Sequence, residues 1–366
     1  MKPIPPVLGD PLYFPRTQLA QALLNGLQAG ISHAFTLFAP RRMGKTQFLL
    51  QDIMPQAQAM GFRVFYFSFM DMDAEHSARH FQAALAAFEA ARVGAKVKRF
   101  LGSVKSLNVA GSGVAREPAA AAAETSVSQI IGRLAHGKQP VLLLLDEVQE
   151  LARVRGTEGI VRSLRTGLDR HKDVVKVIFT GSSTNGLRAM FNDGKAPFFH
   201  FAHNIDFPEL QRDFTDYLAD VYVQRTNQAI DRDQLYQIFE RMNRTPLYLR
   251  LVIEDMILNP ALSLPVAAQR RIAQTGEQAN YEQLWWQLSA LDQYLLQCLA
   301  HGQRNLYQAA ARQAAARALG VEVVTASSVQ GSIRKLERRE LLTRDSHGRL
   351  CINEAAFQTW ITEWDG

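Results

Sequence analysis

The chain has 366 residues, a hydrophobic share of 47% and a formal net charge of +6, which predicts a globular protein of two or three modules and leaves open a nucleic-acid or acidic partner. No run approaches the ~18 apolar positions of a membrane helix, and the N-terminus lacks the apolar core of a signal peptide. The two cysteines, Cys298 and Cys351, lie far apart and indicate neither a zinc site nor a disulfide framework, so we expect a cytoplasmic protein.

The N-terminal stretch predicts an extended arm and then a helix. Residues 1–16 are rich in proline, which favours an extended backbone. Thr17 is the expected N-cap of a helix that continues to about Gly30. An apolar strand covers residues 33–39, and the helix after it ends near Met60.

A basic loop ending in Gly-Lys-Thr joins this strand to the helix that follows. Strand, loop and helix in this order are typical of a phosphate-binding loop, whose backbone N–H groups surround a phosphate at the positive end of the helix. Lys45 is expected to reach the β- and γ-phosphates of a nucleotide, and the Thr46 hydroxyl to bind Mg²⁺. Ala39 stands where the usual spacing has its first glycine, and the alternative is a chance Gly-Lys-Thr in a surface loop. The predicted nucleotide-binding residues of the loop are Pro40, Arg41, Arg42, Met43, Gly44, Lys45, Thr46 and Gln47.

The next part of the chain alternates between strands and helices. Residues 61–69 are mostly apolar, as strands buried in a parallel sheet are. A helix follows at 75–92. Residues 94–125 are irregular, with a possible small hairpin at 106–114, and a further helix covers 125–136.

A third strand ends in two carboxylates. Residues 141–145 are all aliphatic, and Asp146 and Glu147 follow them. Beside a phosphate loop, Asp146 is expected to hold Mg²⁺, mostly through water, and Glu147 to polarise the attacking water. The alternative is that both acids stabilise the N-terminus of a following helix.

A fourth strand, 174–179, follows a helix at 157–171 and ends in small hydroxyl side chains. Ser182 or Ser183 is expected to hydrogen-bond the γ-phosphate or the attacking water, and an ordinary helix N-cap is an equal alternative. A last strand lies around residues 203–208.

Beyond this strand the pattern predicts helices only. Pro246 suits the first position of a helix, with Thr245 as its N-cap. The expected helices are 211–226, 231–242 and 246–258, with a partly helical polar stretch at 260–280.

The C-terminal part predicts a winged helix-turn-helix. A helix runs from about Tyr281 to Ala300, helices follow at 306–318 and 325–340, and residues 341–352 form strand, tight turn and strand. Basic side chains there suit phosphate contacts with double-stranded DNA, and the alternative is a module that contacts a protein or the rest of the chain. The candidate DNA-contacting residues are Arg334, Lys335, Arg338, Arg339 and Arg349.

Taken together, these motifs resemble the prokaryotic archaeal-type ATPases, relatives of the STAND NTPases within the AAA+ class. The segments that carry the resemblance are 14–16, 40–46, 145–150, 180–183 and 245–249. The resemblance implies an α/β fold, namely an ATP-binding αβα core with a parallel five-stranded sheet, an all-helical lid and a winged helix. It also implies that Arg16 lies near the nucleotide and Pro246 near the base.

The resemblance further suggests how subunits would cooperate. Arg188 stands where AAA+ proteins often place an arginine finger, which would act within an ATP-bound homo-oligomer; a surface arginine is the alternative. The chain departs from the family pattern at residues 197–201, where a Gly-Arg pair is usual, and at Arg244, where glycine is usual.

We therefore expect an ATPase core over residues 1–210, a lid over 211–280 and a winged helix over 281–366. The expected cofactors are ATP and Mg²⁺, and the expected function is a nucleotide-controlled switch. A DNA-associated role in mobile-element biology, repair or defence is the first hypothesis for its use. One alternative is a regulatory ATPase whose output is a contact with an unidentified protein partner. Another is a regulator that binds ATP without hydrolysing it.

Overall fold

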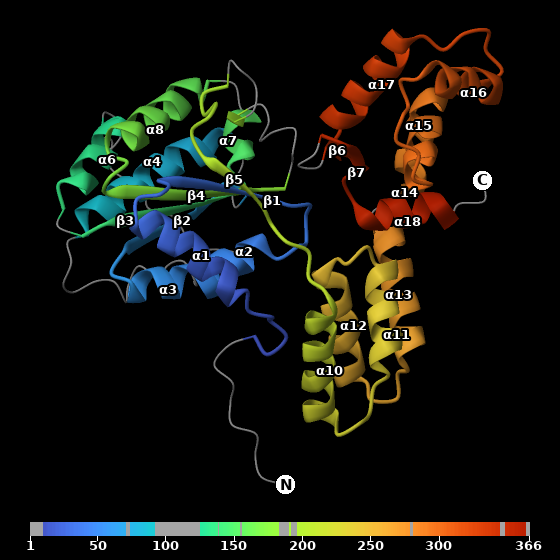
Figure 1. Ribbon diagram of the computed structural model, residues 1–366, viewed down its shortest axis with the longest axis horizontal. Helices are drawn as coiled ribbons and strands as arrows, with labels where there is room; N and C mark the ends of the chain where they lie inside the picture. The colour runs from blue at the N-terminus through green and yellow to red at the C-terminus, as the bar shows by residue number, and fades with distance from the viewer. Residues whose placement is uncertain are drawn as a thin grey trace.

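Figure 1 shows the computed structural model of the chain, with the sheet and its covering helices to the left and two helical groups to the right. The structure describes residues 10–70, 74–91, 125–137, 139–153, 156–182, 190–191, 196–278, 281–344 and 348–363. The possible hairpin at 106–114, Ser183 and Arg188 lie outside these ranges.

The core is a five-stranded sheet in the order β2-β3-β4-β1-β5, and every neighbouring pair is parallel, as the sequence predicted. Both central strands β3 and β4 are buried throughout, which explains why their sequences are apolar without alternation. This order brings the carboxyl ends of β1 and β3 to either side of β4. The strands are β1 (Ala34–Phe38), β2 (Arg63–Ser68), β3 (Val141–Asp146), β4 (Val175–Gly181) and β5 (His203–Asp206).

Helices cover both faces of the sheet (Figure 1). One apolar cluster joins α4, α6 and α8 to one face, and a second joins α1 and the helices after the phosphate loop to the other. Alternate residues of β3 enter the two clusters: Leu143 belongs to the first and Leu144 to the second. The helices are α1 (Thr17–Gln28), α2 (Lys45–Gln47), α3 (Met54–Ala59), α4 (Ala74–Ala90), α6 (Val127–Ala135), α7 (Gln149–Arg153) and α8 (Glu158–Arg170).

Two local predictions in this region need correction. The helix expected after the loop is interrupted by a π-helical segment, Phe48–Ile53. Pro55 follows this segment and has no N–H to donate, so it suits an N-terminal position of α3. Thr17 was expected to cap α1, but Arg16 holds the N-cap position and makes no side-chain capping bond.

Four helices form a separate group after β5 (Figure 1). Their shared apolar cluster includes Leu218, Phe239 and Ile253, and it also takes in Leu12 from the N-terminal arm. Pro246 begins α12 as predicted, but the Thr245 side chain makes no capping bond. The helices are α10 (Arg212–Thr226), α11 (Arg232–Arg241), α12 (Pro246–Leu258) and α13 (Leu264–Gln278).

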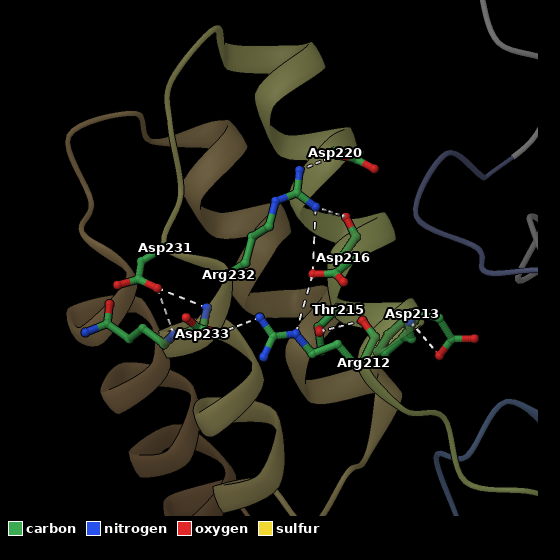
Figure 2. Close-up of polar contacts among 10 residues, drawn as sticks. Arg212, Asp213, Thr215, Asp216, Asp220, Asp231, Arg232 and Asp233 are labelled. Carbon is green, nitrogen blue, oxygen red and sulfur yellow. Dashed lines mark hydrogen bonds and ion pairs between the residues drawn. The ribbon is translucent and has the colours of Figure 1, made fainter.

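Figure 2 shows how arginines tie α10 to α11. Arg232 pairs with Asp220 at 2.5 Å and with Asp216 at 3.7 Å, and Arg212 pairs with Asp233. These side chains are largely exposed, and solvent screening weakens the attraction between their charges.

The C-terminal region contains the three helices and the two-stranded antiparallel sheet that the sequence predicted. The helix expected from Tyr281 to Ala300 is divided, because Ser289 and Asp292 form a capping box that begins a new helix. A last helix, α18, was not predicted. It packs into the apolar cluster that the other C-terminal helices and the two strands share. The elements are α14 (Tyr281–Trp286), α15 (Ala290–Ala300), α16 (Ala309–Leu319), α17 (Ala326–Arg338), β6 (Leu342–Arg344), β7 (Leu350–Ile352) and α18 (Ala355–Glu363).

In the part of the chain that the structure describes, no helix has both the length and the apolarity that crossing a bilayer requires.

Candidate functional site

The loop between β1 and α2 is held by hydrogen bonds from Lys45. Gly44 has a φ of 90°, which glycine adopts without strain, whereas Arg42 has a strained φ of 70°. Lys45 is buried, and its Nζ donates to the carbonyl oxygens of Ala39 and Pro40 at 2.8 and 2.9 Å. The loop thus holds an ammonium group at the N-terminus of a helix, an arrangement suited to binding phosphate.

Asp146, the last residue of β3, accepts hydrogen bonds from three hydroxyl groups. The Thr46 hydroxyl donates to Oδ2 at 2.6 Å, and the Thr180 hydroxyl donates to Oδ1. Tyr66 donates to Oδ2 at 3.2 Å. Burial raises the pKa of Asp146, while the threonine hydrogen bonds and the charge of Lys45 oppose that rise. A cation bound here would favour the ionised carboxylate.

Glu147 follows with a strained φ of 53°. Its Oε2 accepts hydrogen bonds from the backbone N and the hydroxyl of Ser182 at 3.0 and 2.7 Å, and from Gln149 Nε2 at 2.5 Å. Burial alone would raise the pKa of Glu147, but the charge of Lys45 and these hydrogen bonds hold it below its usual value. Glu147 is therefore a fixed, ionised carboxylate beside the lysine of the loop.

Arg16 connects the N-terminal arm to the phosphate loop. Its backbone N donates to the Asp52 carboxylate at 2.8 Å, in the π-helical segment. Its guanidinium lies 4.0 Å from the ring centroid of Phe207 and donates to the carbonyl oxygens of Pro208 and Met43. Burial lowers the pKa of Arg16 to about 10, so the side chain stays charged at neutral pH.

A cavity of about 720 Å³ lies beside the loop. Its walls come from the loop, the end of β5, the start of α12 and the β6–β7 hairpin. The volume falls within the range of about 300–1,000 Å³ that is usual for small-molecule sites. Pro246, expected near the base, is buried at the start of α12 and does not itself line the cavity, although Thr245, next to it in sequence, does. The loop residues in the wall are Ala39, Pro40, Arg41, Arg42 and Met43.

Residues 13–249 match a family model described as an ATPase domain predominantly from Archaea. The chain belongs to this family. Its fold is similar to that of a Walker-type ATPase of Pyrococcus abyssi, with 15% identity, a TM-score of 0.68 and 96% of each chain covered. It is also similar to the ORC2 protein of Aeropyrum pernix, with 14% identity, a TM-score of 0.55 and coverage of 96% of this chain and 95% of that chain. A comparison with curated proteins gave no match.

This archaeal-type ATPase is accordingly an ATP-binding P-loop enzyme that hydrolyses ATP. At 14–15% identity, the likeness to these two solved structures establishes the fold and nothing more. The family explains the constellation at the sheet edge, because a P-loop ATPase needs a loop lysine, a hydroxyl and paired acids at neighbouring strand ends.

Two arginines of the phosphate loop of this ATPase contact distant parts of the chain, which the sequence did not predict. Arg41 pairs at 3.3 Å with Glu340, which lies two residues beyond the last residue of α17. Arg42 pairs with Glu354 at 3.0 Å and donates to the Tyr248 hydroxyl. The C-terminal region therefore lies against the loop.

The candidate DNA-contacting residues are only partly brought together. Arg334 and Arg338 are exposed on α17, and Arg339 is exposed at its C-cap position. Lys335 instead donates to the buried carboxylate of Asp292 at 2.5 Å. Arg349 is exposed on β6–β7 and lines the cavity beside the phosphate loop.

Sequence reasoning missed two residues of the site. Gln149 was noticed only as part of a family motif, and its position two residues after Glu147 was the available signal. Tyr66 gave no signal, because only strand pairing brings β2 beside Asp146. Gln47, predicted to contact nucleotide, accepts a hydrogen bond from Gln51 at 2.5 Å.

Proposed function

We propose that this ATPase uses Mg²⁺ when it hydrolyses ATP and that the bound nucleotide controls the contact between its phosphate loop and its C-terminal region. The observation that carries the switch is the pair of ion pairs Arg41–Glu340 and Arg42–Glu354, which join the loop to that region. Nucleotide phosphates would bring negative charge to the loop that carries both arginines.

The residues at the sheet edge fit a magnesium ion. Mg²⁺ prefers oxygen ligands and is usually held by one or two carboxylates together with substrate phosphates and water. Thr46 and Asp146 offer a hydroxyl and a carboxylate 2.6 Å apart, and among the described residues no group of three or more His, Cys, Asp and Glu side chains forms a closed metal cage. When bound, the ion would neutralise charge on the β- and γ-phosphates.

For hydrolysis, we assign one role to each residue. Lys45 and the loop N–H groups bind the phosphates, and Glu147 takes a proton from the attacking water. Ser182 orients Glu147, because its hydroxyl donates its single proton to that carboxylate. The γ-phosphate contact expected of Ser182 or Ser183 is then assigned to Ser183. On the family resemblance, we place Arg16 near the nucleotide and Pro246 near its base. On the same ground, Arg188 would act as an arginine finger toward the nucleotide of a neighbouring subunit in a homo-oligomer.

The strength of the loop contacts suits a switch. Arg41 has 51% of its side chain exposed and Arg42 has 38%, so each ion pair is worth only about 0.2–1 kcal/mol. A ligand shifts a conformational equilibrium by its difference in affinity for the two states, and nucleotide binding easily supplies a difference of this size.

Glu147→Gln tests hydrolysis and the switch together. We expect this variant to bind ATP without releasing phosphate, because a neutral amide does not accept the proton of the water. In the trapped complex, hydrogen exchange at residues 340–354 should differ from that of the nucleotide-free protein. Lys45→Ala, which loses the phosphate contact, is the control and should show no change on adding ATP.

Each half of the proposal has its own contradicting result. Phosphate release by Glu147→Gln at the wild-type rate would refute the role of Glu147. Unchanged exchange at 340–354 in the ATP-bound variant would refute the switch and leave the hydrolysis assignment standing.

We further propose that the chain divides into a core at 1–210, a lid at 211–280 and a winged helix at 281–366. The separate apolar clusters of the lid and the C-terminal region support this division, although Leu12 of the arm joins the lid cluster. The second candidate function is a DNA-associated ATPase of STAND or related type, and the exposed arginines of α17 favour it. A protein contact through the same region is the remaining alternative.

A further inference from the structure

Three hydrogen bonds converge on one oxygen of the Glu147 carboxylate. Gln149 Nε2, the Ser182 backbone N and the Ser182 hydroxyl all donate to Oε2, at 2.5, 3.0 and 2.7 Å. A carboxylate oxygen has about two lone-pair directions, so this oxygen is saturated. Oε1 is the oxygen left to accept a further proton.

The orientation of Gln149 follows from its surroundings. The residue has an exposed fraction of 0% and begins α7, directly after the turn that contains Glu147. Its Oε1 is buried, and no hydrogen-bond partner for it is found among the described residues. Reversing the amide would place that oxygen against the Glu147 carboxylate, and two acceptors would repel each other. Gln149 therefore keeps one acceptor unsatisfied while its N–H₂ holds Glu147.

We propose that Gln149 is a positioning residue for ATP hydrolysis, which together with Ser182 fixes Oε2 of Glu147 and leaves Oε1 to activate water. This inference rests on the proposed role of Glu147 as the base. A carboxylate with one oxygen held cannot rotate freely, so its other oxygen keeps one direction toward the attacking water. The strained φ of 53° at Glu147 is consistent with a side chain whose direction is fixed.

Atoms and electrons balance in the hydrolytic step. Oε1 of Glu147 takes a proton from water as the water oxygen bonds to the γ-phosphorus. The bond from that phosphorus to the β,γ-bridging oxygen breaks, and its electron pair leaves with ADP. The proton on Glu147 then returns to solvent or to the released phosphate. Gln149 and Ser182 donate to Oε2 throughout and exchange no proton.

Gln149→Met tests the proposal, since methionine keeps the length of the side chain and removes the N–H donors. We expect kcat to fall about tenfold with KM and ATP affinity unchanged within about twofold, because the carboxylate is misdirected while the phosphate site is intact. Val148→Ala is the matched control: it alters the neighbouring buried side chain without touching the carboxylate and should keep the wild-type kcat.

Combination with Glu147→Gln separates this inference from the proposed function. In that background Gln149→Met should have no further effect on turnover, because the group it positions is already lost. If Gln149→Met does not fold, Ser182→Ala removes another donor to the same oxygen and should lower kcat by a smaller factor.

One result would contradict the proposed function, and another would contradict only the positioning role of Gln149. A Glu147→Gln enzyme that hydrolyses ATP at the wild-type rate would overturn the proposed function. An inactive Glu147→Gln enzyme, together with wild-type kcat in Gln149→Met and Ser182→Ala, would overturn the positioning role alone.

Discussion

At the scale of single residues, Lys335 shows how burial redirects a charge. The sequence offered it as a DNA contact, but its ammonium lies 2.5 Å from Asp292, whose side chain is 0% exposed. Burial alone would raise the pKa of Asp292, and the hydrogen bonds from Lys335 and Ser289 outweigh that effect and lower it. A buried carboxylate binds the nearest cation because leaving it unpaired is costly.

We predict that Lys335→Ala lowers the free energy of unfolding by about 1–2 kcal/mol, a moderate value because Lys335 itself is partly exposed. The lowered pKa of Asp292 means that its ionised form stabilises the fold above the unfolded-state pKa and loses this effect as pH falls through the folded value. The cost of the substitution should therefore be full near neutral pH and shrink in acid. Urea unfolding at several pH values measures this.

Arg338→Ala is the control for Lys335→Ala, since Arg338 is exposed on the same helix. It should change stability by no more than about 0.5 kcal/mol at any pH. Equal effects of the two substitutions would show that the Lys335–Asp292 pair contributes nothing specific.

At the scale of elements, the contact between α6 and α8 depends on one glycine. A Cβ built on Gly167 would lie 2.9 Å from the Ser128 Cα and 2.9 Å from the Ile131 Cδ1. Backbone at that distance cannot move without displacing α6. Gly167 therefore lets two helices approach closely over the sheet, a role that no helical pattern in the sequence reveals.

We predict that Gly167→Ala destabilises the protein by about 1–3 kcal/mol, because overpacking outweighs the gain in helix propensity. Gly159→Ala, on the same helix, is the matched control, because among the described residues its new methyl group would meet no atom within 4 Å other than its own chain neighbours and the backbone of its own helix. It should leave stability unchanged or raise it by up to about 1 kcal/mol. Chemical denaturation compares the two, and equal stability of both variants would contradict the steric argument.

The elements themselves were largely predictable. All five strands and helices α10, α11 and α12 lie close to the expected ranges, because buried parallel strands and amphipathic helices have distinct periodicities. The errors concern helix ends and interruptions. Ser289 begins a new helix where continuous helical periodicity concealed the break, and α18 beyond the hairpin was missed.

At the scale of the whole molecule, the C-terminal region meets the phosphate loop on one side and presents α17 on its surface. If the exposed arginines of α17 bind DNA, their contacts are with phosphates and depend on salt. If ATP binding changes the contacts between the phosphate loop and the C-terminal region, it should also change the affinity for DNA. The DNA-associated proposal can therefore be tested directly.

We predict salt-dependent binding of double-stranded DNA that differs with and without ATP. The double substitution Arg334→Ala and Arg338→Ala should make the plot of log binding constant against log salt concentration less steep, by the slope that about two phosphate contacts contribute. Arg241→Ala, an exposed arginine on α11, is a control for loss of surface charge. Absence of binding at low salt in both nucleotide states would refute the DNA role and favour a protein contact.

Local patterns were enough to predict the sheet, the phosphate loop, and Asp146 and Glu147 at the strand end, because burial and phosphate chemistry each leave a short signature in the sequence. The groups that hold those residues became known from the folded chain alone. The Arg41 and Glu340 side chains are separated by 299 positions, and Lys335 and Asp292 by 43. No local pattern records such pairs, because their contact depends on how separately formed helices and strands pack together.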